Sequence, residues 1–318
     1  PIKSSAASDV YKRQVEMGTG DVYGGGELGI VGSYRDEETN RIYSGGSSTI
    51  VIKGGTILDE VYGGGMGTPK NVLSGAIGNA TTIVSGNTKI NGSVYGGGAY
   101  SIVGNKVTID RTPQTGGRID PILTDADNNA TVNIVILGGT IGDETRLVSA
   151  GSNSLTSSVG NVFGGGYGPK ATVAGSTYVF IGKPDTTSYP DSSNLIKNLN
   201  QTTIIIIGNV YGGGDMGSIG FYAKTSQVDT SDFGTSNYEK IPGLSSNVSI
   251  KTSGTLITIG IENNNKTGNI YAGGRGGNLA TEISTELPET KAETLKGYAI
   301  VHGDSNPVSY THLTLPTT

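Results

Sequence analysis

The chain contains no cysteine, no tryptophan and only two histidines among its 318 residues. Without cysteine it can form no disulfide, no thiolate metal site and no cysteine nucleophile. His302 has no candidate partner at the spacing of a catalytic or metal-binding motif, and we expect it on an exposed strand or loop; His312 lies close to the C-terminal end. The chain therefore has too few histidines to favour a histidine metal site or a serine–histidine–carboxylate triad. We expect no metal and no cofactor.

Charge is also scarce. Asp, Glu, Lys and Arg make up 15% of the chain, and the formal net charge is −5; a typical domain has ~25% charged residues. No basic cluster is present, so nucleic acid and anionic membranes are poor candidate partners. No apolar run approaches the ~20 residues of a transmembrane helix, and we expect no membrane insertion within this sequence. Abundant Thr, Ser and Asn indicate a neutral, hydroxyl-rich surface.

Glycine, by contrast, is plentiful, with 53 residues. Many of these glycines belong to six copies of one motif, in which a β-branched and an aromatic residue precede a glycine triplet. The copies are Val22-Tyr23-Gly24-Gly25-Gly26, Val61-Tyr62-Gly63-Gly64-Gly65, Val94-Tyr95-Gly96-Gly97-Gly98, Val162-Phe163-Gly164-Gly165-Gly166, Val210-Tyr211-Gly212-Gly213-Gly214 and the altered Ile270-Tyr271-Ala272-Gly273-Gly274. Repetition on this scale is typical of a solenoid, in which each repeat stacks on the next.

The segments between the copies have the pattern of short strands. Ile50 and Ile52 alternate with polar or outward positions before Gly54-Gly55, and residues 131–141 repeat that pattern and end in the same Gly-Gly-Thr-Ile sequence. Period-two alternation predicts a half-buried strand, and paired glycines predict a turn. Short strands joined by glycine corners predict an all-β fold, a parallel β-helix over residues 15–280. We expect it to be right-handed, because parallel crossovers strongly prefer that hand.

The repeats differ in length, from 33 residues between Tyr62 and Tyr95 to 68 between Tyr95 and Phe163. The longer repeats hold either extra turns of the solenoid or loop insertions. Residues 114–129, 183–200 and 221–244 look like insertions, because they are rich in Pro, Asp, Ser, Thr and Asn and have weak periodicity. Loops that project from a solenoid often carry its binding contacts.

The motif has two interpretations. In the structural one, glycines relieve crowding between stacked backbones and permit unusual dihedral angles, the rings stack on one another, and the preceding residue points inward. The inward residues would be Val22, Val61, Val94, Val162, Val210 and Ile270. In the functional one, a surface row of rings binds sugars. We favour the structural interpretation.

Carboxylates are the only plausible catalytic groups. Asp21 and Glu60 occupy the same position, two residues before the aromatic, and stacked repeats would bring them into the range of a glycosidase carboxylate pair. The equivalent residues in the later copies are Ser93, Asn161, Asn209 and Asn269. This series favours a polar outward position over a catalytic one, and its asparagines could form a ladder of side-chain amides. Glu27 and Asp215 match in position directly after the triplet, with several repeats between them.

The two ends lack the repeat. Residues 1–14 and 308–318 resemble peptides translated from sequencing-adapter DNA, although two ordinary frayed termini are the alternative. If the resemblance holds, the chain is an internal fragment whose ends pack poorly on the body. Residues 281–307 then form a C-terminal extension, and a helical pattern at 288–296 within it could cap the solenoid or begin an insertion.

The Thr-x-Ile-x-Ile strands, Gly-Gly-Thr-Ile corners and Asn-Val-Tyr/Phe-Gly-Gly-Gly units resemble repeats of large surface proteins from gut bacteria. They are similar, more loosely, to chlamydial polymorphic outer-membrane proteins and other autotransporter passengers. The resemblance implies export to the cell surface and adhesin-like binding of glycans or surface proteins. It supplies no catalytic residue. A polysaccharide-degrading hydrolase or lyase that uses Asp21 and Glu60 is the first alternative, and a trimeric phage tail fibre is the second.

Overall fold

The computed structural model of the chain describes residues 20–32, 34–35, 42–43, 45–68, 78–104, 108–110, 122–125, 127–144, 160–169, 171–185, 194–220, 241–252, 254–260, 268–278, 296–297 and 299–311. Every element bounded within these residues is a β-strand. No helix among them is long and apolar enough to cross a membrane. The all-β class expected from the sequence is confirmed, and the two main sheets are parallel.

The six motif copies form one parallel sheet of two-residue strands. In order across the sheet these are β1 (Val22–Tyr23), β5 (Val61–Tyr62), β7 (Val94–Tyr95), β13 (Val162–Phe163), β16 (Val210–Tyr211) and β20 (Ile270–Tyr271). Each valine pairs with the valine or isoleucine of the next copy, and each aromatic residue with the next aromatic. The copies therefore stack in register along one side of the molecule.

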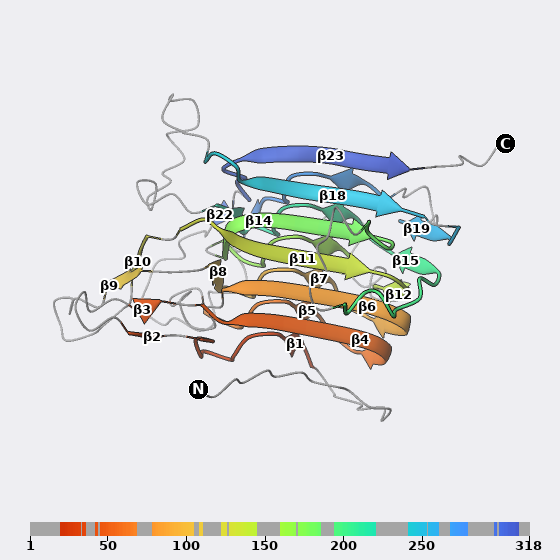
Figure 1. Cartoon of the computed structure of the whole chain (residues 1–318), viewed down its shortest axis with the longest axis horizontal. Helices are drawn as coiled ribbons and strands as arrows, with labels where there is room; N and C mark the ends of the chain where they lie inside the picture. Colours follow the sequence, from red (N-terminus) through yellow and green to blue (C-terminus); the bar gives the residue numbers. More distant parts are fainter. Residues whose placement is uncertain are drawn as a thin grey trace.

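A larger parallel sheet lies across the interior from the motif sheet (Figure 1). Its long strands are β4 (Ser47–Ile57), β6 (Asn79–Ile90), β11 (Ala130–Ile136), β14 (Thr172–Ile181), β18 (Ser245–Lys251) and β23 (Asp304–Thr311). Shorter strands that pair within it are β8 (Ile102–Gly104), β12 (Gly139–Ile141), β15 (Ile204–Ile206), β17 (Ser218–Ile219) and β19 (Ile257–Ile259).

Glycine corners curl this sheet. The continuous strand β6 pairs with β11 through its first half and with the separate strand β12 through its second half. The break between β11 and β12 consists of Leu137 and Gly138, and Gly139, the first residue of β12, has a φ of +101°. Gly86, in the corresponding part of β6, has a φ of +64°, a conformation that only glycine adopts without strain. The Gly-Gly-Thr-Ile pattern thus marks a bend within the sheet.

Each repeat contributes one layer, whatever its length. Strand β7 pairs directly with β13 although 68 residues separate Ser93 from Asn161, the residues that precede them. The same holds for β13 with β16 and for β16 with β20. The longer repeats consequently hold insertions and not extra turns, which decides between the two possibilities that the spacing left open.

The main core lies between the two sheets. Val61, Val94, Val162 and Val210 are fully buried in it, and Val22 and Ile270 pack against it at the two ends. The larger sheet supplies the opposite wall through fully buried side chains of alternate residues, including Val84, Ile134, Ile136, Ile181 and Ile206. The inward direction expected for the residue before each ring is found in all six copies.

Within the described residues, three local antiparallel pairs lie outside the two main sheets. These are β2 (Tyr34–Arg35) with β3 (Ile42–Tyr43), β9 (Thr108–Asp110) with β10 (Ile122–Asp125), and β21 (Gly277–Asn278) with β22 (Lys296–Gly297). Figure 1 shows β2, β3, β9 and β10 projecting at one end of the larger sheet. Of the predicted helical segment, 288–295 lies outside the described residues, and Lys296 belongs to β22.

The chain ends fall mostly outside the described residues, which begin at 20 and stop at 311. The boundary expected at residue 308 lies within β23, which pairs with β18 as far as Thr311. His302 was expected on an exposed strand or loop; it does lie in a loop, but the expected exposure was wrong. It is half-buried against Gly220 in a bend before β23, and burial lowers the pKa of its imidazole.

Candidate functional site

The aromatic residues of the motif form a continuous stack. Consecutive ring centroids lie 4.6–5.1 Å apart, with planes within 5–13° of parallel. This spacing is the distance between neighbouring strands. The four inner rings are at most 7% exposed, while Tyr271, at the end, is 46% exposed. Ring faces that cover one another cannot stack on a ligand, so the interpretation of the motif as a row of sugar-binding rings is wrong for the inner copies.

The glycines of the triplets are required by close backbone approach. A Cβ atom on the first glycine of copies one to five would lie 2.0–2.4 Å from the carbonyl oxygen of the first residue of the next triplet. A Cβ on the second glycine would lie 2.6–2.7 Å from the next copy's third glycine. None of these glycines has a positive φ in the left-handed range. The crowding explanation is confirmed, whereas a positive φ is not the reason for glycine at these positions.

The altered sixth copy follows from the same geometry. Strand β20 is the last strand of the motif sheet within the described part of the chain. A Cβ on Gly273 would meet nothing within 4 Å. Alanine is therefore tolerated at position 272, because its methyl group faces no further copy.

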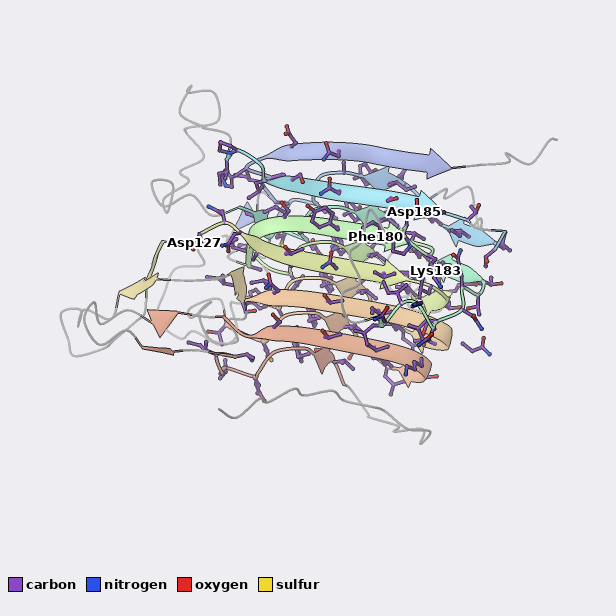
Figure 2. All side chains as sticks on the ribbon, in the orientation of Figure 1. Asp127, Phe180, Lys183 and Asp185 are labelled. Atoms are coloured by element: carbon purple, nitrogen blue, oxygen red, sulfur yellow. The ribbon has the colours of Figure 1, made fainter. Side chains whose placement is uncertain are left out.

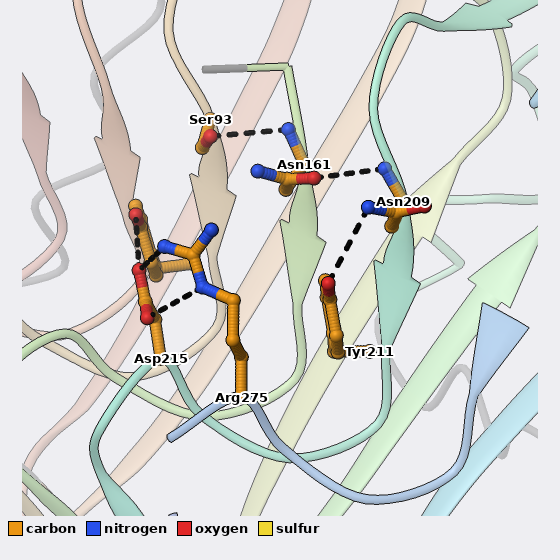
Figure 3. Close-up of polar contacts among 7 residues, drawn as sticks. Ser93, Asn161, Asn209, Tyr211, Asp215 and Arg275 are labelled. Atoms are coloured by element: carbon orange, nitrogen blue, oxygen red, sulfur yellow. Dashed lines mark hydrogen bonds and ion pairs between the residues drawn. The ribbon is translucent and has the colours of Figure 1, made fainter. Parts of the chain in front are cut away.

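The polar position before each motif forms a ladder between side chains and backbone (Figure 3). Ser93 Oγ accepts a hydrogen bond from the Asn161 backbone N–H at 3.1 Å. Asn161 Oδ1 accepts from the Asn209 N–H, and Asn209 Oδ1 from the Asn269 N–H, both at 2.8 Å. The predicted ladder exists, but the donors are backbone amides of the next copy and not side-chain amides.

Asp21 forms the first step of this ladder. Its Oδ1 accepts from the Glu60 backbone N–H at 2.9 Å, and its Oδ2 accepts from the Tyr23 hydroxyl at 2.8 Å. The stack does bring the two catalytic candidates together, and it adds Asp59. One oxygen from each of these three half-buried residues lies within 4.8 Å of the others. Oxygen ligands of this kind suit Ca²⁺ or Mg²⁺, although Oδ1 of Asp21 already accepts in the ladder and Oδ2 already accepts from Tyr23.

Glu27 and Asp215 do not meet. Asp215 is 1% exposed and pairs with Arg275 of the next copy, which donates from Nε to Oδ1 at 2.9 Å and from Nη2 to Oδ2 (Figure 3). The guanidinium also lies 5.3 Å from the centre of the Phe163 ring. Burial raises the pKa of the Asp215 carboxyl, and Arg275 opposes this rise. A buried bidentate pair joins the fifth and sixth copies and leaves little access for a substrate.

The outer face of the larger sheet presents a second regular surface, which we call the polar face. It consists of two adjacent rows of outward residues, one residue of each row on every long strand. The first row is Ser47, Asn79, Thr131, Ser176, Ser245 and Asp304, and the second is Thr49, Thr81, Asn133, Tyr178, Asn247 and Asn306. All twelve are half-buried or exposed. Only Asp304, on the edge strand, carries a charge.

Tyr178 is the one aromatic side chain of the polar face. It lies between Asn133 of β11 and Asn247 of β18, each in register on a neighbouring strand. The Asn247 amide is held by bonds from Nδ2 to the Thr177 carbonyl at 3.0 Å and to Ser245 Oγ at 2.9 Å, and its Oδ1 accepts from Asn306. Among the described residues, neither the Tyr178 hydroxyl nor the Asn133 amide has a hydrogen-bond partner.

A buried apolar cluster borders the polar face. The next outward row, Val51, Ile83, Val135 and Phe180, packs with Leu137 against Ile196 and Leu199. The last two residues belong to the expected insertion at 183–200, and Lys183 Nζ donates to the Lys197 and Leu199 carbonyls. Figure 2 shows Phe180 on β14 and Lys183 beyond the end of that strand. Residues 194–200 of this insertion thus cover the sheet and do not project from it.

Comparison of the chain with family models, curated proteins and solved structures finds no match. Any functional conclusion therefore rests on the surfaces described above. Sequence reasoning missed the polar face, because its residues are ordinary outward positions of separate strands. Their alternation with Ile and Val was a signal that they point outward, but only the register shows which of them are neighbours.

Proposed function

We propose that the chain is part of a secreted or cell-surface display protein of a bacterium, adhesin-like, which binds glycans or surface proteins without catalysis. The observation that carries this proposal is that the motif residues make contacts within the protein. The glycines, the rings and Asp21 all serve contacts between layers. The insertions and the outward side chains differ from one repeat to the next. In a stacked repeat protein these parts are available to bind a ligand.

We further propose that the scaffold is a right-handed parallel β-helix. The motif sheet and the larger sheet would be two faces of one coil, and each repeat would complete one turn. In support, each layer runs from the motif sheet through the larger sheet to the next motif strand, with in-register parallel pairing on both sides. The preferred hand of parallel crossovers supports the right-handed choice.

The test is incubation with a panel of polysaccharides, followed by assays for both binding and products. The proposal predicts binding of at least one glycan or surface protein, with no new reducing ends and no unsaturated products. Turnover that disappears in Asp21→Asn and in Glu60→Gln, with both variants still folded, would contradict it and favour the hydrolase or lyase. The acidic group of Asp21, Asp59 and Glu60 is where such an activity would be sought.

A further inference from the structure

We infer that the polar face around Tyr178 is a binding site for a neutral polysaccharide, with the Tyr178 ring as its stacking platform. This inference rests on the proposed function and deepens it, because it names the ligand class and places the site on the sheet and not on the insertions.

The geometry supplies the two kinds of contact that a sugar needs. A pyranose presents an apolar face of C–H groups and a rim of hydroxyls. Tyr178 is half-buried and packs against the apolar cluster of Phe180, with the two ring centroids 6.4 Å apart and the ring planes 7° from parallel. A ring fixed by packing loses little conformational entropy on binding, which favours affinity. Phe180 itself is 5% exposed and serves as support.

Hydrogen-bonding groups flank this ring on both sides. Asn133 offers an amide with both donor and acceptor capacity, and Asn247 is oriented by its three bonds with one lone pair of Oδ1 remaining. Strand spacing sets these residues ~4.8 Å on either side of Tyr178, and the two rows are ~6.6 Å apart along a strand. The repeat of hydroxyls and amides from β4 to β23 suits an extended chain of similar units better than a compact ligand.

Charge decides the class of polysaccharide. Eleven of the twelve positions of the polar face are hydroxyl or amide residues, and the twelfth, Asp304, is at the edge. No Lys or Arg belongs to these rows, so uronic acids and sulfated sugars would find no counter-charge. A protein partner would need an apolar core in its interface. The nearby apolar row of Phe180 and its neighbours is instead covered by Ile196 and Leu199.

The experiment is affinity electrophoresis of the full chain in gels that contain one soluble polysaccharide at a time. Neutral probes are a β-glucan, a mannan and a xylan, and charged probes are polygalacturonate and an alginate. The variants are Tyr178→Thr, which keeps a good strand former, and Asn133→Ala. Tyr271→Ala is the matched control, because it removes an exposed tyrosine from the other sheet. Circular dichroism and the thermal midpoint check that each variant is folded.

We expect the wild type to be retarded by at least one neutral polysaccharide. Tyr178→Thr should weaken binding by about tenfold or more, the scale found on truncating an aromatic anchor, while Tyr271→Ala should bind as the wild type does. If Tyr178→Thr and Asn133→Ala are folded and are retarded as strongly as the wild type, this site is overturned. The proposed function would still stand. Binding of no polysaccharide by the wild type would overturn this site, and the proposed function would fall only if the chain also bound no surface protein. Preference for the charged probes would overturn the neutral class.

Discussion

Single glycines set how closely consecutive layers of this protein approach. The second glycine of each triplet faces the third glycine of the next copy, and in copies one to five no room is left for a methyl group. In the sixth copy the same position is open, because no further motif strand follows in the described chain. The second glycine of the triplet is thus required in the first five copies and is not required in the sixth.

This difference gives a matched pair of substitutions. In Gly97→Ala the new Cβ would lie 2.6 Å from the Gly166 backbone nitrogen, so the strands must separate. We expect a loss of about 1–3 kcal/mol in the free energy of unfolding, the usual cost of overpacking. Gly273→Ala, with nothing within 4 Å, should change it by less than about 0.5 kcal/mol. Denaturant unfolding measures both, and equal losses would contradict the close approach.

The buried tyrosines predict a loss of stability in alkali. Burial raises the pKa of Tyr62 and of Tyr95 well above the ordinary value of 10.0. Below pH 10 the tyrosine hydroxyls keep their protons in the folded and in the unfolded protein. Above it the unfolded protein releases these protons while the folded protein retains them. Unfolding therefore becomes more favourable as the pH rises. Tyr62→Phe should flatten the fall of the thermal midpoint above pH 10. A parallel fall in the variant would show that Tyr62 does not contribute.

At the scale of an element, the segment 194–200 shows that an insertion can be part of the fold. Ile196 is 4% exposed within the apolar cluster of Phe180, whereas its neighbour Leu195 is 36% exposed. Ile196→Ala should lower the free energy of unfolding by about 2 kcal/mol or more, and Leu195→Ala by less than about 1 kcal/mol. Thermal denaturation of the two variants checks this. Equal effects would mean that the segment does not dock through Ile196.

A consequence concerns experiments on binding. Deleting residues 183–200 would uncover Ile83, Val135 and Phe180 together with Leu137. An exposed apolar patch promotes aggregation. A loss of binding in such a deletion would therefore not identify the insertion as the ligand site. Point substitutions on the polar face separate binding from folding more cleanly.

The elements show why prediction from this sequence succeeded only in part. Alternating Ile50 and Ile52 and the Val-Tyr pairs predicted inward and stacked residues, because those patterns are local. The single layer across the 68-residue repeat was not predictable, because length does not distinguish an extra turn from an insertion. The neighbours Asn133, Tyr178 and Asn247 were not predictable either, since their contact depends on register between strands that lie far apart in the sequence.

At the scale of the whole molecule, six layers of unequal sequence length form one regular stack. Its two long sides make different kinds of contact. The motif side is closed by glycines, rings and the Asp215–Arg275 pair, and its contacts are internal. The opposite side presents the polar face, whose outward residues repeat at the strand spacing. Both proposals rest on this division. The motif side holds the layers together, and the polar face is directed outward.

The central claim, one layer per repeat, is most directly tested by a distance across the larger sheet. The absence of cysteine allows spin labels to be attached at Thr49→Cys and Asn247→Cys without background. These positions are linked by four consecutive register pairs, through Thr81, Asn133 and Tyr178. Pulsed dipolar spectroscopy should give a separation of roughly 19 Å, four strand spacings of ~4.8 Å. A separation of about 24 Å or more, five strand spacings or above, would show at least one additional layer within the long repeats and would contradict the account.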